Sequence, residues 1–126
     1  MLKRSFAAPL TLSMTSIILL AACGGDSEAL TPPPDADVVV EALDGNKFDK
    51  SEYTATAGEV DLAYLGRSSI SHTLLVASED GEQVGDKLKV TSGTTDEGTY
   101  ELSAGNYQLI CDVPGHTGMK ATLVVS

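Results

Sequence analysis

The segment from Cys111 to Met119, with the sequence CDVPGHTGM, carries three side chains that bind soft metal ions. Cys111 offers a thiolate, His116 an imidazole and Met119 a thioether, and copper favours this set of ligands. Apolar, strand-like runs flank the segment, so we expect it to form a loop at one end of a sheet. Pro114 and Gly115 favour a change of chain direction there, which can bring Cys111 and His116 onto one ion.

A second imidazole lies far upstream, at the start of a β-rich run. His72 begins the sequence HTLLV, and strand alternation puts His72, Leu74 and Val76 on one face. We expect that face to point into the protein, with His72 at the mouth of the strand. A single cysteine is often only a small buried hydrophobe, and a single histidine on a strand is usually structural. The order of Cys111, His116 and His72 with this loop nevertheless predicts a metal site.

The elements that must position these residues are short strands. From Asp37 onward, β-rich runs alternate with turn signals such as Asp44-Gly45-Asn46, Glu79-Asp80-Gly81 and Ala104-Gly105-Asn106. No segment has an apolar stripe of helical period, so the pattern predicts one all-β domain, a sandwich or a barrel. The first expected strand starts with Val38-Val39-Val40, and the others are 47–57, 59–65, 71–77, 84–90, 98–102, 107–111 and 121–125.

Two stretches, Ser71–Val76 and Tyr107–Met119, resemble the copper-binding elements of cupredoxins, the group that contains plastocyanin, azurin and auracyanin. The run LSAGNY over Leu102–Tyr107 is also similar to that family, as is the strand led by Gly58 that feeds the histidine strand. The resemblance spans residues 37–126, and the Cys-x4-His spacing with Pro-Gly before the histidine is its most specific part. It implies a cupredoxin-like Greek-key β-sandwich of about seven or eight strands.

The resemblance also implies a site for one type 1 copper ion. The family's ligands match four residues of this chain: His72, Cys111, His116 and, as the long axial ligand, Met119. Azurin-like loops place three residues between the second histidine and the methionine, and other loops place four, whereas only Thr117 and Gly118 stand there in this chain. Thr73 occupies the position where the family often has an asparagine that ties two loops together near the sulfur. A threonine hydroxyl can do this, but less well.

The function implied is that of a mononuclear electron-transfer protein of the cell envelope, which cycles Cu(I)/Cu(II) between redox partners. His116 is the expected port for the electron, with an apolar contact patch at Val113, Pro114 and Gly115. Storage or delivery of copper is an alternative role, and zinc held by the same ligands is an alternative metal. We do not expect an enzyme, because both histidines are used in the site and no orienting group is recognisable beside a Cys111–histidine pair.

The N-terminus has the features of a secretory signal. Lys3 and Arg4 precede an apolar stretch that ends in Leu20-Ala21-Ala22-Cys23, and the stretch is too short and interrupted for a transmembrane helix. This ending resembles the lipobox of bacterial lipoproteins, which implies cleavage before Cys23 and a diacylglycerol on its thiol; otherwise Cys23 is a spare thiol. The expected organisation is 1–22 lipoprotein signal peptide, 23–36 lipidated cysteine and disordered, flexible linker, and 37–126 cupredoxin domain.

The charge is strongly acidic. The chain has 18 acidic and 8 basic residues, and removal of Lys3 and Arg4 with the signal leaves a net charge of −12. Such a surface repels nucleic acid and anionic lipid headgroups, and it favours a basic redox partner or serves solubility alone. We expect a monomer, lipid-anchored on the extracytoplasmic side of a membrane, which is the periplasmic side in a Gram-negative cell. With Cys23 lipidated, Cys111 would be an unpaired thiol in an oxidising compartment, which also favours a metal site.

Overall fold

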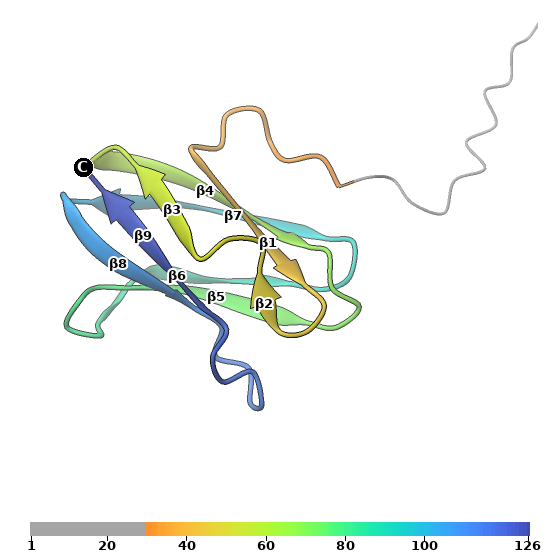
Figure 1. Ribbon diagram of the computed structural model, residues 1–126. Coiled ribbons are helices and arrows are strands. Elements are labelled where there is room, and N and C mark those ends of the chain that lie inside the picture. The colour runs from red at the N-terminus through yellow and green to blue at the C-terminus, as the bar shows by residue number, and fades with distance from the viewer. Residues whose placement is uncertain (1–29) are drawn as a thin grey trace, which may run out of the picture.

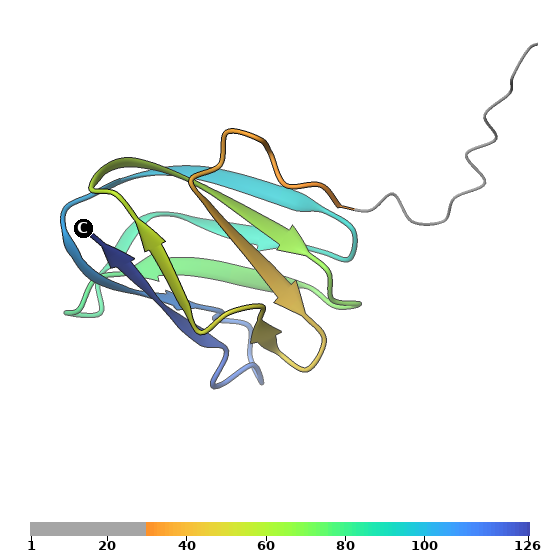
Figure 2. The ribbon, with the colours of Figure 1, turned by 45° about the horizontal axis from the view of Figure 1, so that its top comes forward.

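A computed structural model describes residues 30–126 of the chain, and the predicted signal peptide and Cys23 lie outside this range. In the described part the chain forms strands only, packed as two layers (Figure 1, Figure 2). None of its elements is a helix long and apolar enough to cross a membrane. The all-β sandwich predicted from the sequence is therefore confirmed. The strands are β1 Val38–Leu43, β2 Lys47–Phe48, β3 Glu52–Ala55, β4 Gly58–Gly66, β5 His72–Ala77, β6 Gln83–Val90, β7 Thr95–Leu102, β8 Gly105–Ile110 and β9 Lys120–Val125.

The two sheets have four and five strands. The first has the order β2-β1-β4-β7 and the second the order β3-β9-β8-β5-β6. Two pairs are parallel, β1 with β4 and β3 with β9, and the other pairs are antiparallel. In the second sheet β5 lies between β8 and β6, so the strand that carries His72 is held on both edges.

The segment 47–57, expected as one strand, is two. Lys47–Phe48 joins β1 in the first sheet, and Glu52–Ala55 joins β9 in the second. The break falls at Asp49, whose Oδ1 accepts hydrogen bonds from the Glu41 amide at 2.9 Å and from the Tyr53 hydroxyl at 2.6 Å. Because this carboxylate satisfies donors on both sides of the break, it stabilises the crossing from one layer to the other. Residues 30–126 therefore form nine strands, one more than the eight runs expected from the sequence.

The turn expected at Ala104-Gly105-Asn106 is shorter in the structure. Gly105 already belongs to β8 and pairs with Val125. Its φ of +153° is one that residues with a side chain rarely adopt. The corner is held by Tyr107, whose hydroxyl donates a hydrogen bond to the Ser103 carbonyl at 2.9 Å.

The core lies between the layers, where alternate residues of each strand meet. Leu74 and Val76 of β5 are fully buried, as strand alternation predicted. Burial of each such side chain contributes roughly 1.5–3 kcal/mol to folding. The largest fully buried side chains include Val40, Val60, Leu62, Tyr64, Leu65, Leu74, Val76, Val90, Leu109, Met119 and Leu123.

Residues 30–36, the described part of the predicted linker, lie against the domain. The Ala36 amide donates a hydrogen bond to the Pro33 carbonyl, which closes a turn. The Arg67 guanidinium donates to the Leu30 carbonyl at 2.9 Å and pairs with Glu41 at 2.8 Å. Arg67 therefore joins this segment to the connection between β4 and β5.

Candidate metal centre

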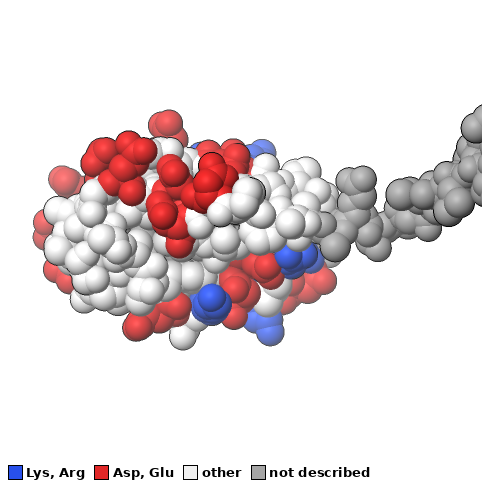
Figure 3. All heavy atoms as spheres, turned by 90° about the horizontal axis from the view of Figure 1, so that it is seen from above, with Lys and Arg blue, Asp and Glu red and all other residues white. Residues whose placement is uncertain are grey.

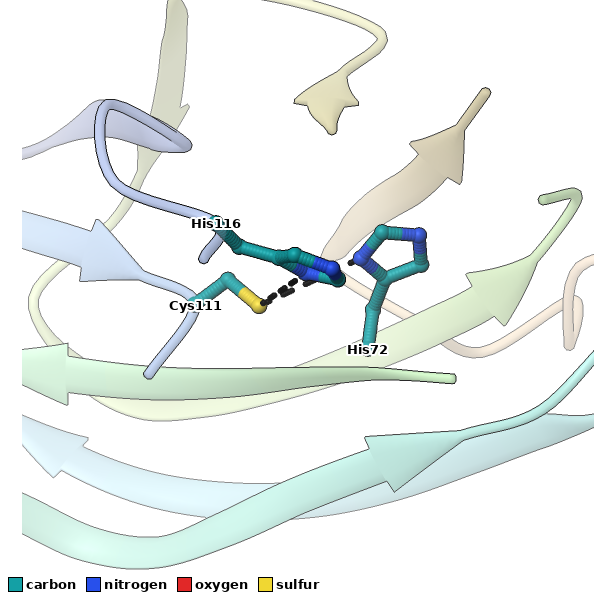
Figure 4. Close-up of side chains that lie close together, drawn as sticks. All are labelled: His72, Cys111 and His116. Atoms are coloured by element: carbon teal, nitrogen blue, oxygen red, sulfur yellow. Dashed lines mark hydrogen bonds between the residues drawn. The ribbon is translucent and has the colours of Figure 1, made fainter. Parts of the chain in front are cut away.

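The structure brings His72, Cys111 and His116 together at one end of the sandwich (Figure 4). His72 is the first residue of β5, and Cys111 directly follows β8. These strands are antiparallel neighbours, with Leu75 opposite Ile110, so Cys111 emerges beside the first residues of β5. His116 comes from the loop between β8 and β9, and it faces the other two side chains. Residues 39 positions apart are thus brought together by the pairing of β5 with β8.

The distances within the cluster fit a single small ion. The Cys111 Sγ lies 4.0 Å from the Nδ1 of His72 and 3.6 Å from the Nδ1 of His116. Bonds of about 2.3 Å to sulfur and about 2.0 Å to nitrogen separate S and N by about 3.5 Å in a tetrahedral site and about 3.7 Å in a trigonal one. All three donor atoms lie within 4.8 Å of one another. The cluster therefore has the size and the donor set of a site for one copper ion.

Three backbone hydrogen bonds close the loop that carries Cys111 and His116. The Cys111 amide donates to the Met119 carbonyl at 3.1 Å, the His116 amide to the Val113 carbonyl at 3.0 Å, and the Met119 amide to the His116 carbonyl at 3.2 Å. Gly115 and Gly118 have φ values of +88° and +93°, a backbone conformation that favours glycine. These bonds and turns fix His116 relative to Cys111.

Met119 is buried at the base of this loop, with 1% of its side chain exposed. Met119 and its neighbours in sequence, Gly118 and Lys120, line a pocket with residues of β2 and of the β2–β3 connection. Contact between the Met119 thioether and the ion stays a prediction.

Burial favours the metal-binding protonation state of His72. Its side chain is fully buried, and desolvation, followed by the nearby His116, lowers its pKa, while Asp44 opposes this. The two imidazole rings are 4.7 Å apart between centroids, with an angle of 44° between their planes. The Nε2 of His72 is buried without a hydrogen-bond partner among the described residues. A neutral imidazole whose Nδ1 faces the sulfur can bind a metal without first losing a proton.

Thr73 lies where the family resemblance placed it, beside the cysteine sulfur. Its Oγ1 is 3.6 Å from Cys111 Sγ and 2.5 Å from the Oδ1 of Asp112. The Asp112 amide donates a hydrogen bond back to the same Oγ1 at 2.9 Å. Thr73 therefore joins β5 to the start of the ligand loop, the segment Cys111–Met119, as expected.

Two residues beside the cluster, Asp112 and Lys87, were not identified from the sequence. Asp112 forms an ion pair with Lys87 of β6, in which the lysine Nζ lies 2.5 Å from the Oδ2 of Asp112. The hydrogen bond from Lys87, and then the one from Thr73, hold the pKa of Asp112 below its usual range. The position of Asp112 directly after Cys111 could have indicated that its carboxylate lies near the site. The pairing of Asp112 with Lys87 could not be predicted, because it depends on strand register.

The surface beside the cluster is partly apolar. His116 keeps 8% of its surface exposed, whereas His72 keeps none, so His116 is the histidine nearer to solvent. Pro114 and Gly115 are exposed and Val113 is half-buried. Ile70, two residues before His72, is 48% exposed and is the one exposed large hydrophobic residue of the described chain.

Comparison with known proteins places the site in context. The sulfocyanin (SoxE) domain matches residues 69–126, the part of the chain that contains all four predicted ligands. No curated protein matches the sequence.

Several solved structures share the fold. Auracyanin A, a "blue" copper protein from the green thermophilic photosynthetic bacterium Chloroflexus aurantiacus, is 24% identical, with a TM-score of 0.61 over 70% of this chain and 96% of that one. Auracyanin B is 19% identical, with a TM-score of 0.65 over 77% and 93%. A purple cupredoxin from Nitrosopumilus maritimus is 16% identical, with a TM-score of 0.58 over 71% and 100%. At these identities the likeness establishes the fold.

Proposed function

We propose that the chain is a cupredoxin that holds one copper ion, and that it is a mononuclear type 1 copper protein that transfers electrons between redox partners in the cell envelope. The observation that carries this proposal is the convergence of the Cys111 sulfur and the two histidine Nδ1 atoms on one buried point. Copper bound there would supply a one-electron couple, which ligands of this kind accommodate in both oxidation states.

The protein's contribution is to keep the ligands in place. His72 is held by strands on both sides of β5, and His116 is held by the hydrogen-bonded loop. Ligands fixed in this way need little rearrangement when one electron enters or leaves, which favours fast transfer. Binding requires Cys111 to be a thiolate, so we expect copper affinity to fall at low pH.

We propose that electrons pass through the edge of His116. The exposed Ile70 lies two residues before His72, and the segment 113–115 lies directly before His116. These apolar residues beside the two histidines support a small, transient docking site. Such a contact is weak enough to release the partner after transfer.

The acidic surface supports a basic partner. Acidic side chains far outnumber basic ones on the face shown in Figure 3. Glu59 and Glu101 lie directly opposite each other on β4 and β7, an arrangement that costs stability. A groove nearby is lined by further acidic residues, among them Asp35, Asp61 and Glu97. A basic redox protein would be attracted to this surface, although solubility alone also benefits from it.

We place the protein on the extracytoplasmic side of a membrane, anchored by a lipid on Cys23. The lipobox-like ending of the predicted signal supports this location. We propose electron transfer rather than catalysis because both histidines of the chain belong to the one cluster.

Visible and paramagnetic resonance spectra of the purified, oxidised protein test the proposal, followed by voltammetry. An intense visible band, a type 1 copper signal and reversible cycling without loss of metal are expected. Rapid loss of reduced copper to an acceptor protein would favour copper delivery. A protein that stays colourless after oxidation and addition of copper would favour zinc.

A further inference from the structure

The Thr73 hydroxyl lies between two acceptors but has only one proton to donate. One acceptor is the Cys111 sulfur at 3.6 Å, and the other is the Asp112 carboxylate at 2.5 Å. The Asp112 amide already donates to the same oxygen at 2.9 Å, so the amide cannot supply the sulfur instead. Whatever determines the direction of this hydroxyl therefore determines whether the sulfur receives a hydrogen bond from Thr73.

The carboxylate is favoured in the structure. Hydrogen bonds to an ionised acceptor are shorter and about twice as strong as neutral ones. The distance of 2.5 Å to Asp112 lies in the range of such bonds, whereas 3.6 Å to sulfur indicates a weak contact. The charge on Asp112 thus draws the Thr73 proton away from the sulfur.

That charge is in turn balanced by one surface lysine. The Nζ of Lys87 lies 2.5 Å from the Oδ2 of Asp112, the carboxylate oxygen that Thr73 does not use. The side chains of Lys87 and Asp112 are 43% and 40% exposed, so the pair is open to solvent. A continuous chain of contacts therefore leads from the surface, through Lys87, Asp112 and Thr73, to the thiolate.

We propose that the Lys87–Asp112 ion pair sets the reduction potential of the copper site by controlling how far the Thr73 hydroxyl turns toward the Cys111 sulfur. This inference rests on the proposed copper function. Lys87, Asp112 and Thr73 act as positioning residues, because none of them is a ligand in the cluster.

The expected signs follow from charge. Reduction adds one electron to the site, so a hydrogen bond to the sulfur stabilises the reduced form. Asp112→Asn removes the negative charge and releases the hydroxyl toward sulfur, and both effects raise the potential. Lys87→Gln leaves the carboxylate unbalanced and strengthens its hold on the hydroxyl, and both effects lower the potential.

The experiment measures the equilibrium of the copper-loaded protein with a redox dye of fixed potential. We expect each substitution to change the equilibrium constant by roughly threefold to tenfold, in opposite directions, allowing for solvent screening of an exposed pair. Lys89→Gln is the matched control. It makes the same charge change on the same strand, directly opposite Thr73, and Lys89 forms no ion pair within residues 30–126. It should shift the equilibrium less than Lys87→Gln.

A double-mutant cycle separates the hydroxyl from simple charge effects. In a Thr73→Val background the effect of Lys87→Gln should shrink to that of Lys89→Gln, whereas in a Thr73→Ser background it should persist. A second readout is the visible band, since a stronger hydrogen bond lowers the energy of the sulfur electrons. The band should move to higher energy in Asp112→Asn and to lower energy in Lys87→Gln.

Equal shifts from Lys87→Gln and Lys89→Gln, or a Lys87 effect that is unchanged by Thr73→Val, would overturn the inference. Those results would leave the parent protein's copper couple intact. A parent protein with no reversible couple would instead refute the proposed function itself, and the inference with it. The two failures are therefore distinguishable.

Discussion

The hydroxyl of Tyr64 donates a buried hydrogen bond to the backbone carbonyl of Thr73, across a distance of 3.1 Å. Tyr64 belongs to β4 of one sheet and Thr73 to β5 of the other, so this bond links the two layers directly beside His72. Burial raises the pKa of Tyr64, so the hydroxyl keeps the proton that it donates. The core thereby anchors the strand that carries the upstream ligand.

We expect Tyr64→Phe to destabilise the protein by about 1–3 kcal/mol, because the buried Thr73 carbonyl loses its partner. Urea unfolding of the metal-free protein measures this effect. Tyr107→Phe is the matched control, since it removes a hydroxyl that donates to the Ser103 carbonyl. Tyr64→Phe should also alter the visible spectrum of the copper form, whereas Tyr107→Phe should not. Identical spectra would show that the bond does not position the site.

Substitution of the sulfur ligand tests the core of the site. Cys111→Ser should abolish the intense visible band, because that band requires a thiolate bound to copper. The serine is nearly the same size, so the fold should survive, which circular dichroism can check. A variant that keeps the parent spectrum would refute the thiolate assignment.

The axial position is tested separately. Met119→Leu preserves an apolar side chain of similar volume in a buried position. We expect copper to stay bound and the reduction potential to rise, because the oxidised ion loses the stabilisation that a weak sulfur donor gives it. Voltammetry and metal analysis measure the two quantities. Loss of copper from this variant would show that Met119 contributes more than a weak axial bond.

The stability of the metal-free protein should depend on pH through His72. Its pKa in the folded protein is lowered, chiefly by burial, so the unfolded chain binds a proton at a higher pH than the folded one. The contribution of His72 to stability is complete above the unfolded pKa of about 6.5. It is lost as the pH falls from there through the lowered folded pKa.

Urea titrations at several pH values between neutral and mildly acidic measure this loss. A His72→Leu variant should show a smaller decrease in unfolding free energy over the same range. The lowered pKa values of Asp44 and Asp112 affect stability in more acidic solutions, so they do not obscure the comparison. An equal decrease in both proteins would assign the pH dependence to other groups.

The parts of the site that could be predicted from the sequence are those fixed by local spacing. Cys111 and His116 belong to one short loop, and His72 begins a strand whose alternation buries it. The role of Lys87 could not be predicted, because it depends on how β6 pairs with β5. That register shifts between Leu74 and Val76, so sequence alternation alone cannot locate the partner of Asp112.

The strand count shows the same limit. The β propensity of 47–57 predicts one strand where the structure has β2 and β3, and the division depends on the hydrogen bonds of one side chain, Asp49, to residues on either side of the break. Propensity describes a residue's preference for extended backbone, and it carries no information about which of two sheets the residue joins.

The last strand has a consequence for how the protein matures. Residues Lys120–Val125 form β9, which lies between β3 and β8 and supplies the only hydrogen-bonded neighbour that β3 has among the described strands. The carbonyl of Met119, directly before it, also closes the ligand loop. A nascent chain that has not reached β9 leaves β3 and β8 without the strand between them, so we expect copper to bind tightly only after β9 has joined the sheet.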